Sequence, residues 1–118
     1  MELQTHSDLV PSARQEGDTV FTVVRGEIDL HNQLALRSAL LEILNTIKPK
    51  KLVVDLRDVP YMDSSAIAAL VESLQKLRKN GGKMCLTNLQ PRVQGLLEIM
   101  RLGSIFEICA DEAEAKKK

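Results

Sequence analysis

The distribution of apolar residues along the chain predicts short strands that alternate with amphipathic helices. Thr19–Arg25 (TVFTVVR) is rich in β-branched residues, which favour strands. Two further apolar runs, Leu52–Leu56 and Lys83–Thr87, are bounded by charged or turn-forming residues, as expected of buried strands. We also expect a final short strand at Ser104–Ile108. A weaker strand within Glu2–Val10 would form a hairpin with Thr19–Arg25 through a polar turn segment.

Three helices are predicted between these strands. The first carries one apolar stripe at helical spacing, made by Leu36, Leu40, Ile43, Leu44 and Ile47. Pro49 terminates this helix. The second helix begins at Ser64 or Ser65 and ends at Asn80–Gly82, where Asn and Gly tolerate the backbone beyond a helix end. The third begins at Pro91, a residue favoured at a first helical position.

This order of elements predicts a single small α/β domain over residues 1–118. Strands separated by helices imply right-handed crossovers, so we expect a mixed, mostly parallel sheet with the helices mainly on one face. Residues 2–110 would be ordered, and residues 111–118 would form a solvated tail with at most a frayed helical turn. Two loops, Gly26–Asp29 and Tyr61–Ser65, fall at strand carboxyl ends, where small α/β sheets place ligands and contacts.

Composition excludes several classes of function. Sixteen basic residues balance sixteen acidic ones, so the chain has no general attraction to nucleic acid or to a membrane surface. Aromatic residues make up 3% of the chain, which argues against a base-stacking surface. We find no apolar run near the roughly 20 residues needed to span a bilayer and no secretory leader, and we therefore expect a cytoplasmic monomer. Cys85 and Cys109 lack a CxxC spacing and are expected to pack as small apolar residues.

The sequence lacks a recognisable catalytic or cofactor-binding motif. It contains neither of the glycine-rich phosphate loops, GxGxxG and GxxxxGK[ST]. His31 has no neighbour that would orient it as a base for Ser64, so a solvent-exposed histidine is the favoured interpretation. Asp55 lies within a strand and Asp58 fits a turn before a proline, which disfavours a metal cluster. We therefore predict a protein that is not an enzyme and that uses no cofactor or metal.

The stretch Asp63-Ser64-Ser65 allows two interpretations. Serine and aspartate are favoured helix N-caps, because their oxygens accept hydrogen bonds from unpaired N–H groups of the first turn. The same position also suits a regulatory phosphate, which would meet free backbone N–H donors and the positive end of the helix dipole. Composition alone favours the structural interpretation, and the two remain open at this point.

Three motifs together resemble the STAS-domain anti-sigma factor antagonists. They are GEID (Gly26–Asp29), VVDLRDVPYMDSSA (Val53–Ala66) and NGGKMCL (Asn80–Leu86). Each is weak alone, but their order and spacing within 118 residues are specific. The resemblance covers nearly the whole chain and implies a phosphorylation-switched binding module that regulates transcription without direct contact with nucleic acid.

The resemblance also implies roles for individual residues. Ser64 would be the phosphoacceptor of a partner that is both an anti-sigma factor and a serine kinase of the GHKL type, and a metal-dependent serine phosphatase would reverse the reaction. Further residues implied at the partner-binding surface are Gly26, Glu27, Asp29, Asp63, Ser65 and Ala66. Ala66 replaces the glycine usual in the family, which bears on the choice of kinase.

An alternative function uses the same fold as a scaffold. A STAS-like subunit of a lipid-transport complex, or of another complex unrelated to transcription, would need no phosphoacceptor. Co-purification with a membrane ATPase would favour this alternative, whereas a small kinase would favour the antagonist.

Overall fold

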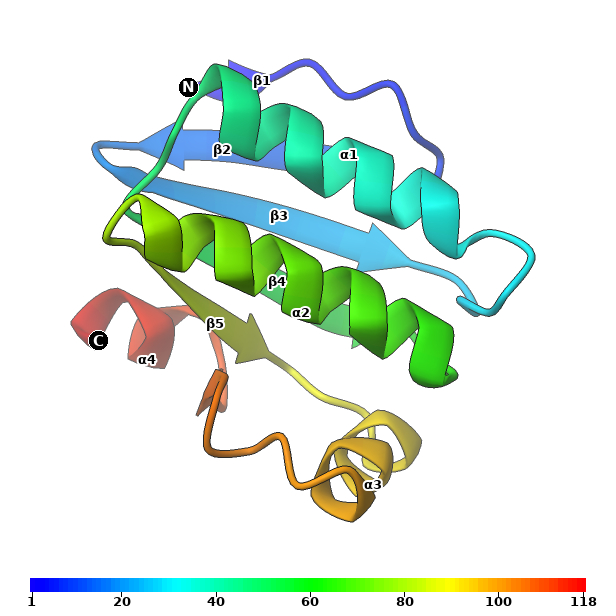
Figure 1. Ribbon diagram of the computed structural model, residues 1–118. Helices are drawn as coiled ribbons and strands as arrows, with labels where there is room; N and C mark the ends of the chain where they lie inside the picture. The colour runs from blue at the N-terminus through cyan, green and yellow to red at the C-terminus, as the bar shows by residue number, and fades with distance from the viewer.

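The structure, a computed structural model, describes residues 1–118 and contains one six-stranded sheet in the order β1-β2-β3-β4-β5-β6 (Figure 1). The strands β1, β2 and β3 pair in antiparallel fashion, whereas β3 to β6 are parallel. The strand bounds are β1 Glu2–Leu3, β2 Ser12–Glu16, β3 Thr19–Arg25, β4 Lys51–Asp58, β5 Lys83–Thr87 and β6 Glu107–Cys109. The expected mixed, mostly parallel sheet is confirmed.

Helices α1 and α2 lie side by side across one face of the sheet (Figure 1). The helix bounds are α1 Gln33–Thr46, α2 Ser64–Lys79, α3 Pro91–Ile99 and α4 Glu112–Lys117. The main core of 24 buried residues joins this face to the apolar stripes of α1, α2 and α3, as expected. Ile67, Leu70, Leu74 and Leu77 form the buried stripe of α2, which fixes the helix that carries the candidate site.

The predicted first hairpin was wrong in its position. The hairpin strand is β2, Ser12–Glu16, rather than a strand within residues 2–10, of which only Glu2–Leu3 is extended. Polar residues form this strand because only Ala13 enters the core, while Arg14 stacks its guanidinium 4.4 Å from the Phe21 ring centroid. Gly17, at φ +60°, makes the tight turn into β3.

The last strand also lies further along the chain than predicted. β6 is Glu107–Cys109, whereas Ser104–Ile108 was expected. Phe106 is buried in the main core, and the N–H of Ile105 donates to Leu102 O at 3.1 Å within a turn. The chain must complete this turn before it can pair with β5.

The tail expected at residues 111–118 is instead α4, which covers the opposite face of the sheet. Asp111 caps this helix through the N–H of Glu114 at 2.9 Å. Ala115 is completely buried in a second cluster whose other members are Phe21, Val53, Cys85 and Cys109. Lys51 Nζ donates to Ala115 O at 3.0 Å, and Lys116 lies 5.5 Å from the Phe21 ring. Lys51 from the sheet and Lys116 from the tail therefore both contribute to the packing of α4.

Both cysteines are free and buried under α4, which confirms that they pack as apolar residues. Burial raises the pKa of the Cys85 thiol to about 11 and also raises the pKa of Cys109. The thiols are therefore protonated and unreactive while α4 remains docked.

Replacing Ala115 with Arg should undock α4, because the cation has no room beneath the helix. We expect Ala115→Arg to lower the free energy of unfolding by about 2–3 kcal/mol and to accelerate thiol labelling of both cysteines. Urea denaturation and labelling kinetics measure the two effects. Ala113→Arg, on the exposed side of the same helix, is the matched control. Equal labelling rates in the two variants would show that α4 does not protect the thiols.

Candidate functional site

The candidate site forms where the loops after β3 and β4 join. Ile28 and Met62 make an isolated parallel bridge beyond the two strands. The N–H of Ile28 donates to Tyr61 O at 3.1 Å, and the N–H of Asp63 donates to Ile28 O at 3.1 Å. Both Ile28 and Met62 are buried, so the two loops are held together from below. The structure thus brings GEID and YMDSS to one edge, as expected from their places in the sequence.

Asp63 caps α2 and ties the two loops together. Its Oδ1 accepts hydrogen bonds from the N–H groups of Ser65 and Ala66 at 3.0 and 3.2 Å. The Ser65 hydroxyl donates to the same oxygen at 2.5 Å, while Oδ2 accepts from the N–H of Leu30 at 3.0 Å. The Ser65 hydroxyl and then these backbone donors lower the pKa of Asp63, so the carboxylate is ionised at neutral pH.

The two serines have different environments. Ser64 is the first residue of α2, is exposed, and its hydroxyl takes part in none of the hydrogen bonds of the structure. Ser65 is half-buried, and its hydroxyl donates a hydrogen bond to Asp63. The helix therefore begins at Ser64, and Asp63 rather than either serine is the cap.

The expectation that a phosphate would meet free N–H donors at the helix start holds only in part. The first-turn N–H groups of Ser65 and Ala66 already bind Asp63, and the N–H of Ile67 donates to Asp63 O at 3.2 Å. They are not free to receive a phosphate on Ser64. Of the N–H groups at this helix start, only that of Ser64 itself has no hydrogen bond.

The GEID loop presents acidic groups close to this helix start. Gly26 adopts φ +91°, which favours glycine, and Glu27 is exposed. Asp29 is half-exposed, and its Oδ1 accepts from the N–H of His31 at 2.9 Å. The His31 side chain is 93% exposed, as predicted.

Two exposed leucines border the same edge and were missed from the sequence. Leu30 is 71% exposed and Leu34 is 61% exposed. They are four residues apart and lie outside the buried stripe of α1. The signal that could have found them is this extra apolar pair on the polar side of an amphipathic pattern.

Ala66 cannot contact a partner, contrary to its expected place in the binding surface. It is completely buried, and its N–H is bound to Asp63. Its methyl group packs in the main core, so its influence on any partner would act through the placement of Asp63.

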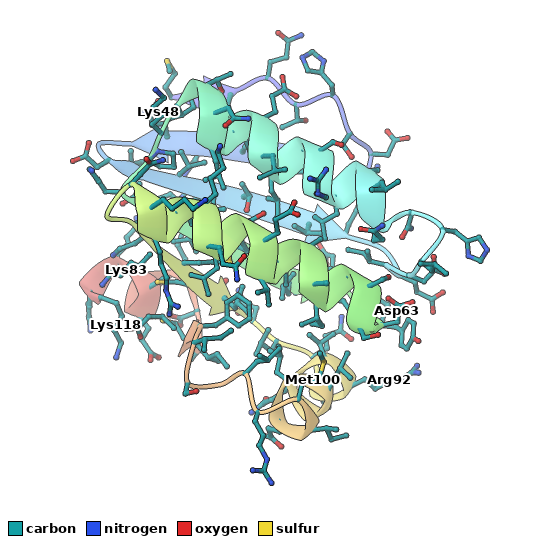
Figure 2. The ribbon with its side chains drawn as sticks, in the orientation of Figure 1. Lys48, Asp63, Lys83, Arg92, Met100 and Lys118 are labelled. Carbon is teal, nitrogen blue, oxygen red and sulfur yellow. The ribbon has the colours of Figure 1, made fainter.

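A shallow groove starts at Ser64 and follows α2. It encloses about 410 Å³ between α2 and the segment after α3. Its lining residues are Ser64, Ile67, Ala68, Val71, Glu72, Gln75, Met100 and Leu102. Figure 2 shows Met100 among the side chains at the α3 end of the molecule.

The aspartates singled out in the sequence do not assemble into a metal centre. No group of three or more His, Cys, Asp or Glu side chains is placed to hold an ion. Asp55 instead pairs with Arg57 Nη2 at 2.8 Å and accepts from Asn88 Nδ2 at 3.1 Å.

None of the helices combines the length and the apolar character required to cross a membrane.

The family model of the STAS domain matches residues 10–115. The chain belongs to the STAS domain family. This domain is 31% identical over 97 residues to the anti-sigma-B factor antagonist of Bacillus subtilis (strain 168), covering 82% of this chain and 87% of that relative.

Solved structures confirm the STAS fold. An anti-sigma factor antagonist from Mycobacterium paratuberculosis matches with a TM-score of 0.80 at 23% identity, covering 89% of this chain and 88% of that one. The Bacillus cell fate determinant SpoIIAA in its phosphorylated form matches with a TM-score of 0.68 at 18% identity, covering 89% and 96%.

Removing the Asp63 carboxylate should loosen this site. We expect Asp63→Ala to lower the free energy of unfolding by about 1–2 kcal/mol at neutral pH, through loss of the helix cap. Because the folded pKa of Asp63 is lowered, its contribution is present above about pH 4 and is lost as the pH falls through that lowered value. Urea denaturation at several pH values measures both effects.

Asp58→Ala is the matched control, because Asp58 is exposed and its carboxylate makes no hydrogen bond or ion pair. A deficit of Asp63→Ala that matched the control, or that stayed constant down to pH 2, would contradict the capping role.

Proposed function

We propose that this STAS domain is an anti-sigma factor antagonist whose docking is switched by phosphorylation of Ser64. The observation that carries the proposal is the exposed Ser64 hydroxyl, which has no hydrogen bond and stands beside a carboxylate already saturated with donors. The name of the Bacillus subtilis relative supports an anti-sigma factor as the partner. The phosphorylated SpoIIAA structure supports a phosphate as compatible with the fold.

The unphosphorylated surface offers both charge and apolar area to a partner. Glu27 supplies an exposed carboxylate and Asp29 a half-exposed one. Leu30, whose N–H is bound to Asp63, and Leu34 at the start of α1 supply exposed apolar side chains. Apolar residues at the centre of a patch with polar groups at its rim are typical of protein interfaces. We assign this surface to the anti-sigma factor.

The switch is electrostatic. A phosphoserine adds about −1.5 to −2 charges near neutral pH. Because Asp63 occupies the N–H groups of Ser65 and Ala66, these donors do not neutralise the added charge. Against acidic groups of the partner, each like-charge pair at about 7 Å and an effective dielectric near 40 costs roughly 1 kcal/mol. A few such pairs reduce affinity by a factor of about 100 or more.

The groups that catalyse phosphoryl transfer to Ser64 would be supplied by the partner kinase. In the kinase, Ser64 Oγ attacks the γ-phosphorus of ATP, the new O–P bond forms as the bond to the β-phosphate oxygen breaks, and ADP leaves. The hydroxyl proton passes to a base of the kinase. We assign the kinase to the GHKL class, place the pathway in the cytoplasm, and assign the reverse hydrolysis to a metal-dependent serine phosphatase.

Phosphopeptide mapping tests this proposal directly. After incubation with ATP and the partner kinase, we expect one phosphate per chain on Ser64 and at least a 50-fold loss of labelling in Ser64→Ala, because that hydroxyl is exposed and unbonded within the proposed docking surface. Ser65→Ala should still be labelled on Ser64, because the Ser65 hydroxyl is bound to Asp63 and is not the expected acceptor. Ser38→Ala, an exposed serine on α1, is the matched control. Undiminished labelling of Ser64→Ala would refute the assignment.

A further inference from the structure

One arginine at this end of the molecule has no acidic partner. Of the seven arginines, five make ion pairs or side-chain hydrogen bonds, and Arg92 and Arg101 make neither. Arg92 is exposed near the start of α3, and its guanidinium lies 4.8 Å from the ring centroid of Tyr61. It therefore rests on an aromatic face while its hydrogen-bond donors remain unused.

This cation is stacked on a residue of the loop that leads into Ser64. Tyr61 precedes Ser64 by three residues, so their Cα atoms are at most about 11 Å apart. The backbone of Tyr61 is fixed by the hydrogen bond from the N–H of Ile28. Figure 2 shows Arg92 and Asp63 at the same corner of the molecule, one at the start of α3 and the other at the start of α2.

Most other groups that could bind a phosphate at this corner are already engaged. The N–H groups of Ser65 and Ala66 bind Asp63. His31 Nδ1 lies 3.5 Å from Asp29, and the guanidiniums of Arg37 and Arg57 pair with Glu72 and Asp55. Arg92 and Arg101 are left without such partners, and Arg92 is the one stacked on the loop before Ser64.

We propose that Arg92 leaves Tyr61 and binds the phosphate of phosphorylated Ser64, as an intramolecular phosphate ligand. The proposal rests on the function proposed above for its biological role. A charge-assisted contact between guanidinium and phosphate is stronger than an exposed cation–π contact, and the fork of arginine donors fits two phosphate oxygens. The exchange of partners is therefore favourable.

Two consequences follow for the surface. The phosphate carries more charge than one arginine neutralises, so the corner stays negative and the electrostatic switch is preserved. Departure of Arg92 also uncovers the ring of Tyr61, the chain's only tyrosine. Phosphorylation thus changes the shape of the corner as well as its charge.

The test uses full-length protein with phosphoserine installed at position 64 by genetic-code expansion, so no kinase is required. A ³¹P NMR titration measures the second ionisation of the phosphate. We expect a midpoint about 0.5 pH unit lower than in the same protein carrying Arg92→Gln, because a nearby cation favours the dianion. The ring-proton signals of Tyr61 should move on phosphorylation toward their positions in Arg92→Gln.

Arg101→Gln is the matched control, since Arg101 is equally exposed and without an acidic partner. It should leave the midpoint unchanged. Equal midpoints with and without Arg92, or an equal shift from Arg101→Gln, would overturn the proposal. If no kinase labelled Ser64, the proposed function would be overturned. The NMR titration would be unaffected, because its phosphoserine is installed without a kinase.

Discussion

The carboxylate of Asp63 sits between two loops and the first turn of α2, and the geometry of the candidate site follows from that position. One of its oxygens accepts three donors from Ser65 and Ala66, and the other accepts the N–H of Leu30. A single side chain thereby orients the GEID loop and caps the helix. The hydrogen bonds that it accepts, first that from the Ser65 hydroxyl, lower the pKa of its carboxyl group. The bridge between Ile28 and Met62 supports the same arrangement from the core.

This arrangement gives two adjacent hydroxyls different environments. Ser65 completes the cap and is half-buried, whereas Ser64 contributes nothing to the cap and is exposed. A charge on Ser64 can therefore change the surface without disturbing the fold. Because the N–H groups of Ser65 and Ala66 are already used, we expect that charge to act on a partner or on the Arg92 cation.

Sequence reasoning located the elements whose residues are buried on a regular pattern. Thr19–Arg25 and Lys83–Thr87 match the observed strands, and Pro91 begins α3. It missed β2 because polar residues can form a strand where an aromatic neighbour such as Phe21 covers them. It undervalued α4 because this six-residue, mostly charged segment is stabilised as a helix by burying Ala115 against the sheet.

The residues of the candidate site also fall into those that the sequence could predict and those that it could not. Local motifs identified Asp63 and Ser64, whose roles depend on neighbours in the chain. Contacts between distant segments decided the rest, including the burial of Ala66 and the stacking of Arg92 on Tyr61. No spacing within one segment reports such packing, since it depends on how α2 and α3 meet the sheet.

The central claim is that charge at Ser64 sets whether a partner docks. Its most direct test is the affinity of the partner kinase for unphosphorylated and Ser64-phosphorylated protein, measured by calorimetry at low and high salt. The account predicts a loss of about 100-fold on phosphorylation that shrinks as salt screens the charges. Equal affinities for the two forms, or a loss independent of salt, would contradict it.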